Sequence, residues 1–130
     1  MTAAPITRTS NGLTILNDHR IAIREGASMH IVQVDDIVSV HAERNVTRIA
    51  IRDCDIRVYL PFGVVLDGLR DFGVVRIHRG SAVNMARVRR LVGRGRHRLF
   101  VVLDGGAEHS VGRAFQSAIR ARVNGVERSW

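Results

Sequence analysis

The sequence predicts one mainly β domain of short antiparallel strands in small packed sheets, with a short internal helix and a C-terminal helix. Its 130 residues are the size of a single domain. Hydrophobic residues make up 45% and charged residues 25% of the chain, as is typical of a globular protein. Short apolar runs separated by turn residues fill most of the chain, which favours strands over long helices.

The first half of the chain is predicted to contain strands only. We expect a polar, flexible lead-in over residues 1–18, a folded domain over 19–124 and a C-terminal tail over 125–130. After residue 18, strands are predicted in the runs RIAIREG, HIVQVDD, IVSVHAERN, VTRIAIRDCD and IRVYLP. Between Thr47 and Leu60, apolar residues at every second position flank a short polar turn. This segment is therefore predicted to form an antiparallel hairpin.

The second half of the chain adds both helices. Apolar residues at spacings of one, three and four predict a short helix after Pro61: Phe62, Val65, Leu66 and Leu69. Apolar residues four apart predict the closing helix, from about Arg113 to Asn124: Phe115, Ile119 and Val123. Between the helices, strands are predicted over Val74–His78, Arg87–Val92, Arg98–Leu103 and Ala107–Val111. The segment RGSAVN is predicted to be a polar connection between the first two of these strands.

The distribution of charge indicates a polyanionic partner. The chain carries 20 basic residues, all of them arginine, against 12 acidic residues, which gives a net charge of +8. Eight arginines and no acidic residue lie between residues 76 and 98. Because guanidinium groups suit bidentate recognition of phosphate and guanine, nucleic acid is the first candidate partner and an anionic membrane surface trails it.

Several other classes of protein are excluded or disfavoured. Cys54 is the only cysteine, so an internal disulfide and a cysteine-rich zinc site are excluded. The six histidines show no metal-binding or catalytic spacing. We expect no enzymatic activity, no metal and no cofactor. The N-terminus lacks the apolar core of a signal peptide and no run is long enough to span a bilayer, so we expect a cytoplasmic protein without a membrane partner.

Three arginine-bearing segments stand at predicted strand ends or connections, over residues 43–48, 76–84 and 110–113. The sequence FGVVRIHRGSAVNMARVRRL resembles the F-x-R-x-H-R-S-x-x-V-N-x-x-x-I segment of the LytTR DNA-binding domain family. HAERNVTRIAI is similar to the family's E-A-x-x-N-Y-V-x-I strand, VVLDGLRDFG to its short helix, and LDGGAEHSVGRAFQSAIRARV to its closing L-x-D-G-x-x-x-x-V-S-R hairpin and helix. The resemblance covers roughly residues 19–123. It implies a LytTR-type fold and a bacterial transcription regulator whose loops enter successive major grooves of double-stranded DNA.

The resemblance also implies a set of contact residues. Base contacts would come from Thr47, Arg79 and Arg113, a phosphate contact from Arg48, and positioning of the DNA backbone from Asn45 and Ser81. The chemistry fits, because arginine donates bidentately to guanine O6 and N7, and threonine offers a hydroxyl to a base and a methyl group to thymine. Threonine is also a common strand residue, so two roles stay open for Thr47: base contact and pairing across the hairpin.

Members of this family are commonly the output half of response regulators. Residues 1–18 are too few for a receiver domain, so we expect the input to come from elsewhere, for example from a regulatory protein partner. By the resemblance, two copies are expected on directly repeated half-sites of DNA. Gly80 and Gly112 stand where the family carries serines. These departures leave an alternative open: a LytTR-like interaction module that modulates another regulator without specific DNA readout.

Overall fold

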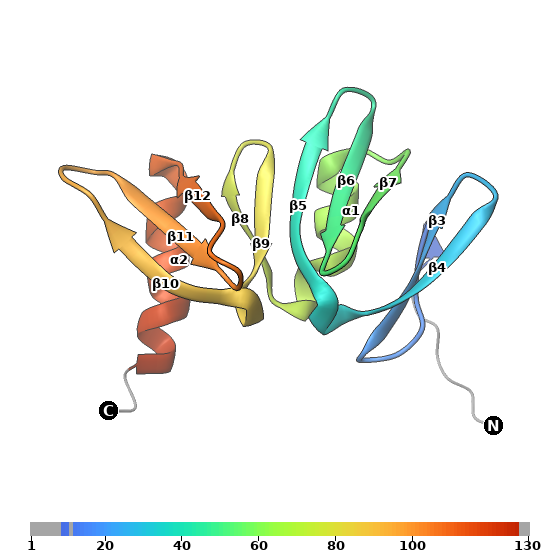
Figure 1. The fold of residues 1–130 in the computed structure, drawn as a ribbon, viewed down its shortest axis with the longest axis horizontal. Helices are drawn as coiled ribbons and strands as arrows, with labels where there is room; N and C mark the ends of the chain where they lie inside the picture. The colour runs from blue at the N-terminus through green and yellow to red at the C-terminus, as the bar shows by residue number, and fades with distance from the viewer. Residues whose placement is uncertain (1–8, 11, 128–130) are drawn as a thin grey trace.

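The structure is a computed structural model that describes residues 9–10 and 12–127. This part of the chain forms three small antiparallel sheets and two α-helices (Figure 1), which confirms the predicted fold class. The first sheet has the order β1 (Thr9–Ser10), β2 (Leu13–Ile15), β3 (Arg20–Glu25) and β4 (Ser28–Gln33). The central sheet has the order β7 (Asp55–Val58), β6 (Val46–Ile51), β5 (Ile37–Glu43), β9 (Ser81–Asn84) and β8 (Val74–His78). The third sheet has the order β10 (Val88–Gly93), β11 (Leu99–Leu103) and β12 (Glu108–Val111).

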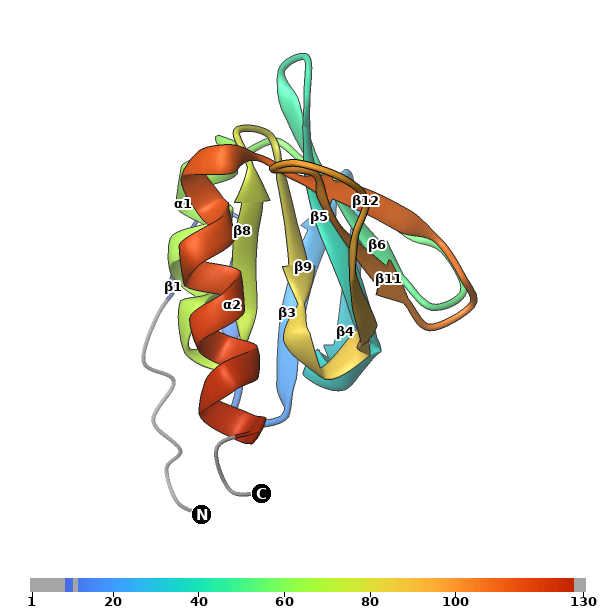
Figure 2. The same cartoon turned by 90° about the vertical axis from the view of Figure 1, so that its left-hand side faces the viewer.

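The helices lie on one side of the molecule, where both contact β8 (Figure 2). The internal helix α1 spans Phe62–Leu69, as its apolar spacing predicts. The closing helix α2 spans Arg113–Glu127, so it begins where predicted and continues past the expected stop at Asn124. Three short 3-10 turns lie between strands or after α1: η1 (Val34–Asp36), η2 (Arg70–Phe72) and η3 (Met85–Arg87).

The domain begins earlier than predicted, because part of the expected lead-in is folded. Strand β2 pairs with β3, with Leu13 opposite Ile23. Leu13 is only 3% exposed and belongs to a hydrophobic core. The boundary at residue 19 is therefore wrong, and the folded domain includes residue 13. A strand of three residues is too short to show a period of two in the sequence. The predictions for residues 1–8 and 128–130 lie outside the described residues.

The predicted polar connection RGSAVN contains a strand, β9, in the interior of the central sheet. Ala82, Val83 and Asn84 are all buried, although they are consecutive. Side chains alternate between the two faces of a strand, so burial of consecutive residues requires cover on both faces. A strand buried in this way shows no alternation of apolar and polar residues, which is why the pattern of the sequence did not reveal β9.

Two hydrophobic cores cover the two faces of the central sheet. The first core includes Ala82 and is built from the first sheet, α1 and β5–β7. The second core includes Val83 and is built from the third sheet, β8 and α2. Asn84 is 1% exposed and ties β9 to η1 and the start of β5, because its side-chain amide donates to the carbonyls of Val34 and Ile37 at 3.3 and 2.9 Å. The cores thus fix the strand from which the candidate site projects.

Candidate nucleic-acid interface

The three arginine-bearing segments come together at one edge of the molecule. They end in the β5–β6 turn, the β8–β9 turn and the connection from β12 to α2, and all three lie at the upper end in both views (Figures 1 and 2). We call this surface the hairpin edge and define it by residues 43–46, 78–81 and 111–113. The tip of the β10–β11 hairpin points to the same side of the molecule (Figure 1).

Backbone hydrogen bonds hold the three segments together, with the β8–β9 turn in the middle. The N–H of Ala42 donates to the carbonyl of Gly80 at 2.9 Å, and the N–H of Gly112 donates to the carbonyl of Ile77 at 2.7 Å. A Cβ atom at Gly112 would lie 3.3 Å from the Phe115 ring, so glycine permits this close packing. The N–H of Gly112 is already bonded within the protein, and it cannot replace a serine hydroxyl as a phosphate donor without losing that bond.

Arg76 fixes the shape of the β8–β9 turn. Its Nε donates to the carbonyl of His78 at 3.1 Å, and its Nη2 donates to the carbonyl of Arg79. The same guanidinium lies over the rings of Phe62 and Phe115, at 5.0 and 5.8 Å from their centroids. These rings come from the first turns of α1 and α2. The turn is therefore held against both helices by one side chain, whose role was not evident from the sequence because its contacts are tertiary.

Arg79 and Arg113 are the two exposed arginines of the hairpin edge that the resemblance assigns to base contacts. Arg79 lies in the β8–β9 turn and Arg113 is the first residue of α2. Neither side chain has a hydrogen bond or an ion pair with any described residue. Their guanidinium groups are therefore available to an external partner.

The tip of the β5–β6 hairpin adds two further exposed polar residues, Arg44 and Asn45. Asn45 adopts a positive φ of 65°, a left-handed conformation that asparagine tolerates in turns. The sequence placed Arg44 in a segment singled out for its charge but assigned it no individual contact. Sequence reasoning missed Tyr59, which is 77% exposed and lines a small hollow together with Asn45 and Phe62. The only sequence signal for Tyr59 is a lone aromatic residue between a strand and a proline.

Arg48 is held by acidic neighbours. Its Nε lies 2.7 Å from Glu43 Oε2 and its Nη1 lies 3.4 Å from Asp55 Oδ2. Arg57 also pairs with Glu43, at 3.0 Å. Hydrogen bonds from Arg48 and then Arg57 lower the pKa of the Glu43 carboxyl below its ordinary value. A phosphate would have to compete with two carboxylates for the Arg48 guanidinium.

Of the two roles that the sequence leaves open for Thr47, base contact and pairing across the hairpin, the structure favours pairing across the hairpin. Its side chain is 0% exposed, and its hydroxyl donates to the carbonyl of Leu60 at 2.7 Å. Thr47 pairs with Val58 across the β6–β7 hairpin and points into the same face as the buried Ile49. With no exposed surface and its hydroxyl donor engaged, Thr47 has nothing to offer a base in this conformation.

Ser81 is half-buried and belongs to a hydrogen-bonded group beneath the hairpin edge. Its hydroxyl lies 3.2 Å from Nδ1 of His41, whose Nε2 lies 2.8 Å from the hydroxyl of Ser39. The His41 ring also packs against His109 of β12, with ring centroids 5.4 Å apart. Burial, together with the charges of Arg48 and His109, lowers the pKa of His41 from 6.5 to about 4. His41 is therefore neutral at pH 7 and links β5 to β9 and β12.

The described residues contain no group of three or more side chains able to hold a metal ion. Cys54 is exposed in the turn between β6 and β7. Within the same part of the chain, neither helix is long and apolar enough to cross a membrane.

Comparisons with known proteins agree with this geometry. The family model described as "LytTr DNA-binding domain" matches residues 27–124. Among solved structures, the chain is similar to the LytTr DNA-binding domain of a protein described as a methyl-accepting/DNA response regulator from Bacillus cereus. The identity is 14%, the TM-score is 0.69, and the match covers 79% of this chain and 94% of that chain. A search of curated proteins gave no match. The protein therefore belongs to the LytTr DNA-binding domain family, a family of DNA-binding domains typical of bacterial transcription regulators and not a family of enzymes.

Proposed function

We propose that this protein regulates transcription by sequence-specific binding to double-stranded DNA, with the loops of the hairpin edge entering the major groove. One observation carries the proposal: Arg79 and Arg113 are exposed, lack an acidic partner among the described residues, and stand on segments joined by the bond from Gly112 to Ile77. Arginine in the major groove can donate bidentately to guanine O6 and N7. In this proposal the two arginines read bases from adjacent parts of the site.

The other exposed polar groups of the hairpin edge supply contacts to the DNA backbone. Arg44 and Asn45 reach furthest, because they form the tip of the longest-reaching hairpin in Figure 1. Tyr59 stands beside them and offers a phenolic hydroxyl. Arg48 takes a secondary place, since Glu43 and Asp55 partly neutralise it. Contacts of this kind fix register and orientation without reading sequence.

Two residues, the half-buried Ser81 and the fully buried Thr47, act beneath this surface in the proposal. Ser81 positions the β8–β9 turn through His41, so its effect on the DNA backbone is indirect. Thr47 supports the β6–β7 hairpin through Leu60 and makes no base contact.

The arginines of the β10–β11 tip extend the basic surface. Arg96 and Arg98 are exposed there, whereas Arg94 is paired with both carboxylate oxygens of Glu108 at 2.7 and 2.9 Å. Each phosphate neutralised by such a group adds a slope of about −0.9 to the dependence of log K on log salt concentration. We expect strong salt dependence, two copies on directly repeated half-sites, and a cytoplasmic location, as DNA binding in a bacterium requires.

Selection of bound duplexes from a random DNA pool at near-physiological salt tests this proposal. We expect enrichment of a short, directly repeated motif. Arg79→Ala and Arg113→Ala should each weaken binding to that motif by about 1–3 kcal/mol and relax the preference at one base position. Arg70→Ala is a matched control, because Arg70 is exposed, pairs with Asp67 alone among the described residues, and begins η2 after the end of α1.

Two results would contradict the proposal. The first is a pool that stays random, which would favour the interaction module that acts on another regulator through a protein partner. The second is an equal loss of affinity for all sequences in Arg79→Ala and Arg113→Ala, which would reduce both residues to phosphate contacts.

A further inference from the structure

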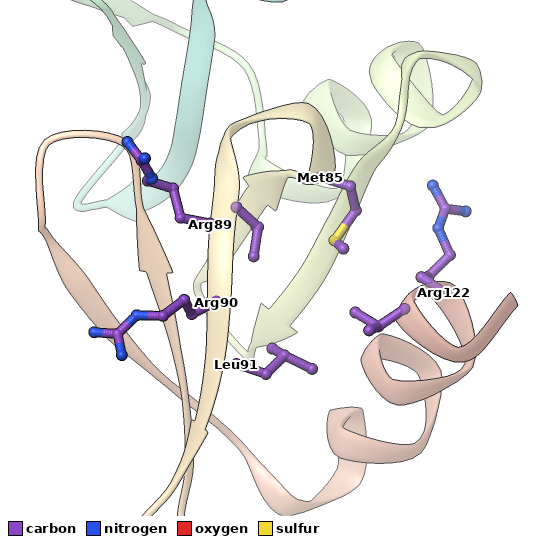
Figure 3. Close-up of a pocket in the computed structure, with 7 residues that line it drawn as sticks. Met85, Arg89, Arg90, Leu91 and Arg122 are labelled. Carbon is purple, nitrogen blue, oxygen red and sulfur yellow. The ribbon is translucent and has the colours of Figure 1, made fainter. Parts of the chain in front are cut away.

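A pocket of about 540 Å³ lies away from the hairpin edge, between β10 and the second half of α2 (Figure 3). It is lined by Met85, Val88, Arg89, Arg90, Leu91, Arg122 and Val123. Its volume is in the range of sites that hold small molecules. Among the described residues, the lining combines four apolar side chains with three arginines and no acidic residue.

The arginines differ in their position at the pocket. Figure 3 shows Met85, Leu91 and Arg122 on the side of β10 that faces α2, whereas the guanidinium groups of Arg89 and Arg90 extend to the other side. Arg89 is also paired with Asp104, at 3.7 Å. Arg122 is therefore the charge that the pocket presents to a ligand.

Arg122 has no hydrogen bond or ion pair with any described residue. Its Nη2 lies 3.9 Å from the position that a Cβ of Gly73 would take, at the end of the pocket near Met85. The apolar wall is also incompletely covered, because Met85, Val88, Leu91 and Val123 are only half-buried. The pocket thus offers, at one end, an arginine without a partner among the described residues and, along its wall, apolar side chains that are partly exposed.

We propose that this pocket binds a small organic anion with an apolar body, whose carboxylate is held by Arg122 and whose chain packs on Leu91 and Val123. A carboxylate accepts two parallel N–H bonds from a guanidinium, which gives affinity and orientation together. An apolar chain gains free energy in proportion to the apolar surface that it removes from water. A cation of the same shape would be repelled by Arg122.

The pocket is independent of the proposed DNA contacts. Arg113 and Arg122 lie nine residues apart on α2, a rise of about 14 Å along the helix. The pocket thus lies apart from the residues proposed to read bases, and the proposal for a ligand stands whether or not the hairpin edge reads sequence.

Titration with three probes of equal chain length tests the site: octanoate, octanol and octylammonium. Amide chemical shifts of the full chain, followed by two-dimensional NMR, should move at Leu91 and Val123 with octanoate at about 1 mM. Arg122→Gln should weaken octanoate binding roughly tenfold and leave octanol binding within about twofold. Arg120→Gln is the matched control, because Arg120 is exposed on the same helix and does not line the pocket.

Three results would overturn the proposal. Octylammonium binding as tightly as octanoate would show that the site does not select an anion. An equal effect of Arg120→Gln and Arg122→Gln would show that only net charge matters. Shift changes confined to residues outside the pocket would place the ligand elsewhere.

Discussion

The buried hydroxyl of Thr47 gives the sharpest test of how the β6–β7 hairpin supports the DNA-binding surface. Valine has nearly the same shape as threonine, so Thr47→Val removes the hydrogen bond to the Leu60 carbonyl without leaving a cavity. A lost hydrogen bond costs about 1 kcal/mol, and an unsatisfied buried acceptor raises the cost. We therefore expect the free energy of unfolding to fall by about 1–2 kcal/mol. For a chain of 130 residues, this corresponds to a fall in Tm of about 4–7 °C.

Two measurements separate a structural role of Thr47 from base contact. Thermal unfolding followed by circular dichroism gives the change in Tm, and fluorescence anisotropy on the selected duplex, well below Tm, gives the change in Kd. We expect the loss of stability with a Kd within about twofold of the original, because Thr47 has no exposed surface. Thr14→Val is the matched control, since Thr14 is a half-buried strand residue whose hydroxyl has no hydrogen bond with a described residue. An unchanged Tm combined with a tenfold weaker and less selective complex would refute the reasoning.

Three further predictions concern other parts of the site and its support. Arg76→Lys keeps the charge but loses the forked donor that holds the carbonyls of His78 and Arg79. Binding to the selected duplex should weaken roughly tenfold, while binding to random duplex hardly changes. An equal loss of affinity for both duplexes, measured by fluorescence anisotropy, would contradict a positioning role. As the pH falls below 6.5, His41 becomes protonated in the unfolded chain, whereas in the folded protein it stays neutral until about pH 4. The free energy of unfolding should therefore fall by about 1–2 kcal/mol between pH 6.5 and pH 4. In denaturant titrations at several pH values, His41→Gln should reduce this dependence of stability on pH. Asn84→Ala leaves two backbone carbonyls without their donor and should lower the free energy of unfolding by about 2–4 kcal/mol; a change below about 0.5 kcal/mol in urea unfolding would show that water replaces the amide.

The sequence predicted well those elements that have a long regular pattern of apolar residues or a residue, such as a proline, that marks their boundary. Helix α1 follows Pro61 and repeats apolar residues at helical spacing, and its bounds agree with the prediction. The hairpin between Thr47 and Leu60 has alternating residues on both strands. The short β2 and the doubly buried β9 escaped prediction, because the first offers too few residues and the second too little contrast between its faces.

The sequence predicted which segments form the candidate site, but it predicted only in part what the individual residues of those segments do. Charge and motif pointed to the loops that now form the hairpin edge. The role of Thr47 was within reach of the sequence, because it shares its strand face with Ile49, which is buried. The partners of Arg48 and Arg76 were not, because Asp55, Phe62 and Phe115 reach them only after the chain has folded. Contacts between residues far apart in the chain produce no periodic pattern in the sequence, so pattern analysis cannot predict them.

The double burial of β9 has a consequence for the thermodynamics of DNA binding. The β8–β9 turn leads directly into this strand, whose amides should be among the slowest to exchange with solvent in the protein. A loop anchored to such a strand has little conformational entropy left to lose when it meets a ligand. Complex formation should therefore spend little free energy on ordering Arg79's backbone, and most of the entropy lost there would come from the arginine side chain itself.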